Sequence, residues 1–314
     1  MDKTNEDDTT TGEHLTVVRI SGIVENGDVT AARKLTIQDA RITSADDLYS
    51  MKSLESLSLA RNKLTDFEFL SQNYSLKVLD LSRNCIRQLP SMENFTNLTL
   101  LNLSHNEITD ISPITDLKNL KVLILNNNKI KNMCALNKLE MLETLILSHN
   151  EIESIKTPTK TMWNLRKITL SHNKIREFPV TDKLPNLQEL RLNANRILAL
   201  PQNIGSLTSL KLLDIGNNRI VDMKPLTKFL NLQNLNVIGN PEPQIMLEDL
   251  KPPLQYLTVF NSINVSDNDS GKPKKKKYVK EADYAKKRKL ERPRDNRQKR
   301  REKKSFTPKG IQRE

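Results

Sequence analysis

Cysteine, glycine and long apolar runs are all scarce in this chain, and each shortage excludes a class of protein. Its 314 residues include only two Cys, Cys85 and Cys134, too few for the disulfide framework of a small secreted protein. The eight Gly include no Gly-rich phosphate-binding loop of the kind found in nucleotide-hydrolysing enzymes. No apolar stretch approaches the roughly 20 residues that span a membrane. We therefore expect a reduced, intracellular protein without a membrane segment.

Positive charge is concentrated at one end of the chain. The formal net charge is +12, but residues 272–314 alone hold 20 Lys and Arg and six Asp and Glu, whereas the remaining residues hold 30 and 32. This basic segment has too few apolar residues to form a packed core, so residues 264–314 are predicted to be a disordered basic tail. The acidic residues 1–14 are predicted to be disordered as well.

The most regular feature of the sequence is the pattern Leu-x-Leu-x-x-Asn, which returns every 22 or 23 residues with other aliphatic residues at some Leu positions. A spacing this constant indicates one supersecondary unit that is copied and stacked, so that each copy buries its apolar face against its neighbours. The pattern therefore predicts a solenoid. Its asparagines, called the ladder asparagines below, are Asn62, Asn84, Asn106, Asn128, Asn150, Asn173, Asn195, Asn218 and Asn240.

Each position of the unit has a predicted role. In the unit 54–64, the alternation around Leu57 and Leu59 is the two-residue period of a short strand, and strands that repeat in one direction form a parallel sheet. The ladder asparagine is expected to satisfy backbone groups in the buried turn that follows, where an unpaired group costs roughly 1–3 kcal/mol. Beyond the turn, apolar residues at every third position, as in Ile108 and Ile111, predict a short helical or 3₁₀ segment.

The segment Leu103-Ser-His-Asn-Glu-Ile-Thr-Asp-Ile-Ser-Pro-Ile114 brings these features together. It resembles the leucine-rich repeat family and is similar to the subclass typified by a nuclear regulatory subunit of type-one protein phosphatase. The resemblance implies an α/β fold, namely a curved horseshoe-shaped solenoid with a parallel sheet on the concave face and short helical or 3₁₀ segments on the convex face. We expect an N-terminal cap at residues 15–31 and the repeat domain at residues 32–263, which ends in a capping strand.

Residues that could perform chemistry do not converge on a catalytic or metal site. Three of the four His, namely His105, His149 and His172, precede a ladder asparagine, and the last two are one repeat apart. No Cys or carboxylate completes their column as a third ligand, and no nucleophile, base and orienting group fall on adjacent repeats. The sequence therefore predicts no metal, no cofactor, no small-molecule substrate and no enzymatic activity.

The outward strand residues form two columns across the repeats, and the middle of these columns is apolar. Because equivalent residues of successive strands lie side by side, the aliphatic ones should form one contiguous solvent-exposed patch. Such patches usually mark a protein partner, although aliphatic residues also fill strands through β-propensity alone. A polar rim toward the carboxyl end would add specificity. The patch comprises Val78, Leu100, Val122, Ile124 and Ile146, and the rim comprises Lys167, Glu189, Arg191 and Asp214, of which the last two are assigned to the partner site.

These columns differ from those of the phosphatase regulators that the chain resembles. The partner face of those regulators is understood to use acidic and aromatic residues, whereas neither column here contains an aromatic residue. Trp163, the only Trp, precedes a predicted strand and is expected to be a packing residue. A phosphatase catalytic subunit is therefore kept only as an alternative partner.

The basic tail contains several clusters that are similar to nuclear import signals. A flexible chain with this much positive charge also binds polyanions by releasing their counterions, so RNA or a ribonucleoprotein assembly is a further predicted partner. The alternative is that the tail serves import alone. The assigned basic residues are Lys274, Lys275, Lys276, Lys277, Lys286, Lys287, Arg288, Lys289, Lys299, Arg300 and Arg301.

Together these features predict a non-enzymatic adaptor. Its concave face would hold a protein partner, and its tail would engage RNA or a ribonucleoprotein in the nucleus or nucleolus. The alternative function is a regulatory subunit of type-one protein phosphatase or a similar enzyme, with a tail that serves only import. The alternative location is the cytoplasm.

Overall fold

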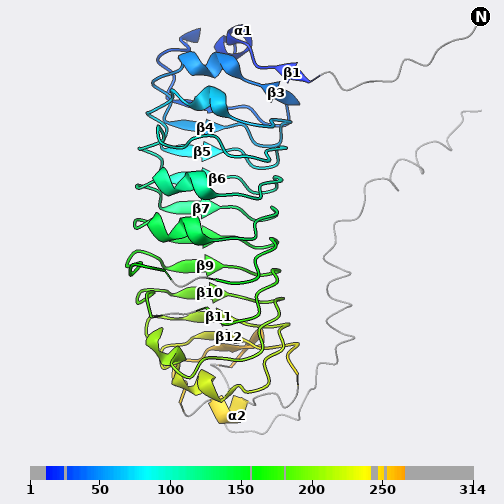
Figure 1. Cartoon of the computed structure of the whole chain (residues 1–314), viewed down its shortest axis with the longest axis vertical. Helices are drawn as coiled ribbons and strands as arrows, with labels where there is room; N and C mark the ends of the chain where they lie inside the picture. The colour runs from blue at the N-terminus through cyan, green and yellow to red at the C-terminus, as the bar shows by residue number, and fades with distance from the viewer. Residues whose placement is uncertain are drawn as a thin grey trace, which may run out of the picture. The chain divides into compact units, whose positions relative to one another are not determined.

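One sheet of twelve short strands runs through the part of the chain that the computed structural model describes, which is residues 12–24, 27–155, 158–179, 182–241, 247–250 and 253–265 (Figure 1). The strands follow one another in sequence order, and all neighbouring pairs are parallel except the last. They are β2 (Lys34–Thr36), β4 (Ser56–Ser58), β5 (Val78–Asp80), β6 (Leu100–Asn102), β7 (Val122–Ile124), β8 (Thr144–Ile146), β9 (Lys167–Thr169), β10 (Glu189–Arg191), β11 (Leu212–Asp214), β12 (Asn234–Asn236), β13 (Val259–Phe260) and β14 (Ile263–Asn264).

The segments that connect the strands are short 3₁₀ turns or irregular chain. Pro113 and Pro225 lie in the first turns of η4 and η7, where the fixed φ of Pro fits and its missing N–H is not needed. Among the described residues, no 3₁₀ turn lies between β5 and β6, between β8 and β9, or between β9 and β10. The predicted short helical segments are therefore present in most connections but not in these three. The turns are η2 (Asp46–Ser50), η3 (Glu68–Leu70), η4 (Ser112–Asp116), η5 (Cys134–Lys138), η6 (Ile204–Ser206) and η7 (Lys224–Lys228), and the last connection holds α2 (Leu247–Leu250).

Each ladder asparagine joins its own repeat to the preceding one, as the sequence predicts. The Oδ1 atom of Asn128 accepts a hydrogen bond from the backbone N–H of Ile108 at 3.0 Å. Its Nδ2 group donates to the carbonyls of Leu103 and Leu125, each at 3.0 Å. Equivalent bonds recur at all nine positions, and every one of these side chains is buried. The ladder therefore satisfies the turn that follows each strand.

A second series of asparagines, which the sequence analysis missed, lies just before the strands. Each of them donates its Nδ2 hydrogen to a backbone carbonyl of the preceding repeat, as Asn119 does to Thr96 at 2.8 Å. The signal that would have revealed them is an Asn-Leu pair that returns at the repeat spacing. The series comprises Asn97, Asn119, Asn164, Asn186 and Asn231.

The two ends of the repeat stack extend beyond the predicted boundaries. Residues 1–14 are predicted to be disordered, but β1 (Glu13–His14) pairs in parallel with β3 (Ile42–Ser44) in a separate two-stranded sheet. The backbone N–H of Leu15 extends this pairing to Ser44, and α1 (Val17–Ser21) then buries Ile20 in the core. At the other end, residues 264 and 265 belong to the stack, while the rest of the predicted tail lies outside the described residues.

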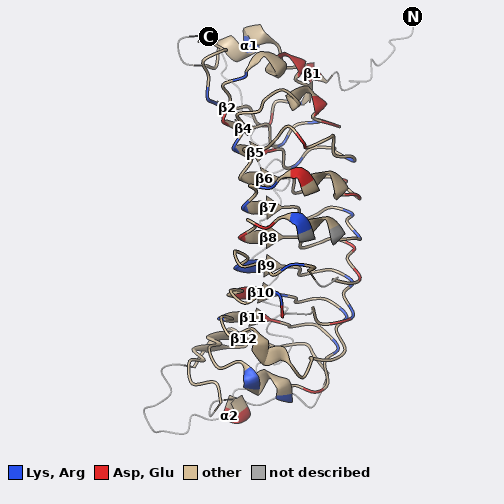
Figure 2. Cartoon of the chain, turned by 60° about the vertical axis from the view of Figure 1, so that its left-hand side comes forward, with Lys and Arg blue, Asp and Glu red and all other residues tan. Residues whose placement is uncertain are grey.

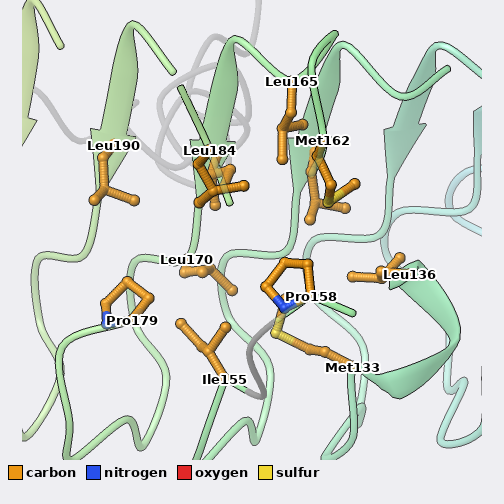
Figure 3. Close-up of a pocket in the computed structure, with 12 residues that line it drawn as sticks. Met133, Leu136, Ile155, Pro158, Met162, Leu165, Leu170, Pro179, Leu184 and Leu190 are labelled. Atoms are coloured by element: carbon orange, nitrogen blue, oxygen red, sulfur yellow. The ribbon is translucent and has the colours of Figure 1, made fainter. Parts of the chain in front are cut away.

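The buried apolar residues of the described repeats form one core cluster, and a packing defect lies beside η5 and the connections on either side of β9. The defect is a cavity of about 40 Å³ beneath β8, β9 and β10 (Figure 3). Its walls are apolar and include Met133, Ile155, Pro158, Met162 and Pro179. A space this small, with mainly apolar walls, does not suit a substrate or cofactor. In the described residues no helix is long and apolar enough to cross a membrane.

Candidate interaction surface

The sheet has one face that points away from the core, and this is the face predicted to be concave. We call it the outer face, and it is formed by the first and third residues of β2 and of β4 to β12. In β7, the middle residue Leu123 is fully buried, whereas Val122 and Ile124 on either side of it are only partly buried. The same alternation occurs in every other strand from β4 to β12. The structure therefore orients these residues as the sequence predicts.

The register of the strands brings the five predicted aliphatic residues together. Val78 lies opposite Leu100, which lies opposite Val122, so these three form one column on β5, β6 and β7. Ile124 lies opposite Ile146 in the neighbouring column. The result is a continuous apolar patch over four strands.

The patch is less accessible than the sequence analysis predicts. All five side chains are partly buried, and none is largely exposed to solvent. Neighbouring parallel strands are only about 4.8 Å apart, so adjacent aliphatic side chains cover one another. A partner would therefore contact a closely packed strip of aliphatic side chains.

The predicted rim is a charged network that is already paired. The Glu189 carboxylate bonds to Arg191 Nε at 2.5 Å and lies 3.1 Å from Lys167 Nζ. Burial raises the pKa of the Glu189 carboxyl, but the hydrogen bonds from Arg191 and Lys167 outweigh burial, and the pKa is lower than usual for Glu. Asp214 lies opposite Arg191 in the register but accepts a hydrogen bond from Asn236 Nδ2 at 2.8 Å. The rim therefore offers fixed polar groups.

The repeated histidines occupy a position of unusual backbone geometry. The residue before each ladder asparagine has a positive φ, which is 56° at His105, 57° at His149 and 56° at His172. The rings of His149 and His172 stack with their centroids 4.2 Å apart. Burial and the nearby charge of Arg83 lower the pKa of His105. In the described part of the chain no group of three or more His, Cys, Asp or Glu side chains is placed to hold a metal ion.

Trp163 is not the packing residue that the sequence analysis expects. Its side chain is 62% exposed, and Met141, at the edge of the adjacent repeat, is 41% exposed. Trp163 lies two residues before the buried Leu165, and its backbone carbonyl accepts a hydrogen bond from Asn186 Nδ2. The predicted import and polyanion residues, Lys274 to Arg301, lie outside the described residues.

Family models match most of this stack. A model described as two copies of leucine-rich repeats matches residues 52–94, 96–138 and 185–228, and a second leucine-rich repeat model matches residues 142–197. Together the matched segments cover more than half of the 314 residues. The chain belongs to the leucine-rich repeat family.

Solved leucine-rich repeat structures share the fold. A leucine-rich repeat protein of Leptospira interrogans is 26% identical, with a TM-score of 0.60 and coverage of 69% of this chain and 62% of that protein. The plant peptide hormone receptor RGFR1 in complex with RGF2 is 25% identical, with a TM-score of 0.60 and coverage of 72% and 38%. A TDR receptor, 21% identical with a TM-score of 0.66 and coverage of 78% and 49%, shows the fold alone. No curated protein matches the sequence.

These comparisons support a general role in protein binding. Leucine-rich repeat proteins are typically non-enzymatic scaffolds or receptors that bind other proteins, and the plant receptor named above was solved with its bound partner. The chain spans less than two thirds of the length of each of the three proteins.

Proposed function

We propose that this leucine-rich repeat protein is a nuclear or nucleolar adaptor. Its outer face holds a protein partner, and its basic tail binds RNA or a ribonucleoprotein. The observation that supports the partner site is the apolar patch of Val78, Leu100, Val122, Ile124 and Ile146, which the strand register joins across β5 to β8. Aliphatic side chains on neighbouring strands offer a partner apolar area to cover, and the charged rim on β9 and β10 supplies orientation.

The tail supports the nuclear part of the proposal through its charge. Residues 272–314 have 20 Lys and Arg and six Asp and Glu, and the residues before them have 30 and 32. Polyanion binding by counterion release therefore belongs to the tail. A regulatory subunit of type-one protein phosphatase, with a tail for import alone, is the alternative. The absence of aromatic side chains among the first and third residues of β2 to β12 argues against it.

The variant Ile124→Asp tests the partner site. Ile124 points away from the core, so a charge there should leave folding intact while it disrupts an apolar interface. The matched control is Thr36→Asp, which adds the same charge on the same face but on β2, which β4 separates from the patch. Both variants would be compared with the wild type by affinity purification from cells and by thermal unfolding.

We expect Ile124→Asp to lose the main co-purifying protein while Thr36→Asp retains it, with both melting temperatures near that of the wild type. Partners involved in RNA processing or ribosome assembly would favour the adaptor, and a phosphatase catalytic subunit would favour the alternative. If Ile124→Asp folds and retains every partner, the aliphatic residues of the patch reflect only the β-propensity of strand positions, and the proposal is wrong.

A further inference from the structure

A second set of outward residues follows the ladder asparagines. After each ladder asparagine from Asn62 to Asn218, the next residue points outward, the one after it is buried, and the third points outward again, as Arg196, Ile197 and Leu198 show. Backbone bonds hold these short segments in register, since the N–H of Arg196 donates to Ile175 at 2.8 Å and that of Arg219 donates to Ile197 at 2.9 Å. We call the residues directly after the first eight ladder asparagines the side column, which comprises Lys63, Cys85, Glu107, Lys129, Glu151, Lys174, Arg196 and Arg219.

Charges alternate along the middle of the side column and neutralise one another. Lys129 Nζ lies 2.9 Å from Glu107, and Lys174 Nζ lies 2.9 Å from Glu151. The Lys129 ammonium lowers the pKa of the Glu107 carboxyl, and the Lys174 ammonium does the same for Glu151. In this part of the column every charge therefore has a partner one repeat away.

The alternation ends at Lys174, and the next two residues of the column are also cations. Arg196 and Arg219 are exposed, and neither forms an ion pair within the described part of the chain. Arg176 is the third residue after the ladder asparagine of the preceding repeat. It is likewise exposed and in no ion pair with a described residue. Like charges on adjacent strand-spaced positions repel one another. The three Arg side chains therefore form a cationic surface, and none of them is in an ion pair within the described part of the chain.

Two large apolar side chains are exposed among these arginines. Leu198 is 59% exposed and Val221 is 55% exposed, and they occupy the same position in consecutive repeats. Each lies two residues after an unpaired Arg, and the N–H of Leu198 bonds to the carbonyl of Arg176 at 3.3 Å. The pair extends the arginine surface with an apolar strip. Figure 2 shows how Lys, Arg, Asp and Glu are distributed along the stack.

We propose that Arg176, Arg196, Arg219, Leu198 and Val221 form a second docking surface, separate from the outer face, for an acidic protein segment that also carries aliphatic side chains. Guanidinium groups bind carboxylates in a bidentate manner, and the segment's aliphatic side chains cover Leu198 and Val221. A nucleic acid would neutralise the arginines but would leave the apolar pair without a matching surface. The chain's own tail is excluded by its positive charge.

The test measures binding of a labelled 12-residue peptide of repeating Asp-Leu-Gly to the full chain by fluorescence anisotropy. The central variant is Arg196→Glu, and its matched control is Lys63→Glu, which makes the same charge change in the same column near the other end of the stack. A second variant, Leu198→Ser with Val221→Ser, removes the apolar strip, and Leu230→Ser, at a residue that is 64% exposed elsewhere, controls for it. Competitors are the same peptide with Asn in place of Asp and a 12-nucleotide oligouridylate.

We expect Arg196→Glu to weaken peptide binding about tenfold, and Lys63→Glu less than about twofold, because only the first charge lies at the site. The apolar double variant should weaken binding about fivefold while Leu230→Ser has no effect, and the Asn peptide should not compete. Equal effects of Arg196→Glu and Lys63→Glu would show that net charge alone attracts the peptide and would overturn the proposal. Equally, if the apolar variant binds normally and oligouridylate competes in an Arg196-dependent manner, the surface binds polyanions and the proposal is wrong.

Discussion

Single asparagine side chains define how the repeats are joined. The Nδ2 group of Asn128 donates to two carbonyls, but both of these also accept from another ladder asparagine, Leu103 from Asn106 and Leu125 from Asn150. The N–H of Ile108, in contrast, donates to Asn128 Oδ1. The acceptor function of each asparagine is therefore harder to replace than its donor function.

We predict that Asn128→Leu lowers the free energy of unfolding by about 2–3 kcal/mol, because the buried N–H of Ile108 loses its acceptor and two shared carbonyls each lose a donor. Asn126→Leu, two residues away on the partly accessible side, is the control and should change stability by less than about 0.5 kcal/mol. Urea unfolding of both variants gives the comparison. Equal stability of the two variants would remove the ladder as a source of stability.

The residue before each ladder asparagine is constrained by its backbone. Its φ is positive in every repeat, and the position holds Arg, His, Asn, Ala or Gly. A side chain in this region costs roughly 1–2 kcal/mol relative to Gly, and Asn tolerates it better than most residues. The sequence did not predict this geometry, because Arg and Ala, which also occupy this position, do not favour a positive φ.

Ala194, with a φ of 56°, provides a direct test of this constraint. We predict that Ala194→Gly raises the free energy of unfolding by about 0.5–1 kcal/mol, since relief of strain exceeds the added chain entropy of Gly. The reverse change, Gly239→Ala, should destabilise, because a Cβ there would lie 2.3 Å from Asn217 Oδ1. Chemical denaturation measures both. A loss of stability in Ala194→Gly would contradict the argument.

At the scale of elements, strands were predictable and connections were not. The Leu-x-Leu alternation locates every strand from β4 to β12, because two buried residues separated by one outward residue indicate a strand. Apolar residues at every third position are compatible with a 3₁₀ turn or with irregular chain, and proline does not decide between them. Pro113 begins a turn, whereas Pro158 and Pro179 line the cavity between irregular connections. The outer-face columns followed from the strands, but the pairing of Glu189 with both cations required side-chain geometry.

At the scale of the whole molecule, charge divides the chain into two parts. Formal charge places a net +14 in residues 272–314 and −2 in the remainder. A nearly neutral repeat domain has little general attraction for polyanions, so the tail should supply most of the affinity for RNA. The separation also means that partner binding on the outer face and RNA binding by the tail can be measured independently.

We predict that deletion of residues 272–314 disperses a fluorescent fusion from the nucleus and reduces RNA binding to background, while the melting temperature of the repeat domain is unchanged. Replacement of the same segment by a neutral Gly-Ser linker of equal length controls for the loss of chain. In the intact protein, RNA affinity should fall steeply as salt increases from about 50 to 200 mM. Retention of salt-insensitive RNA binding by the deletion variant would place the site on the repeats.

The identical bonding at each boundary between repeats has a consequence for how such a chain can evolve. A ladder asparagine recognises only a backbone N–H and a backbone carbonyl of the preceding unit, at offsets of 20 or 21 and 25 or 26 residues. Duplication or loss of one whole unit in the gene recreates those offsets, whereas a change of several residues within a unit breaks them. Repeat number is therefore free to drift, and repeat length is held almost constant by natural selection.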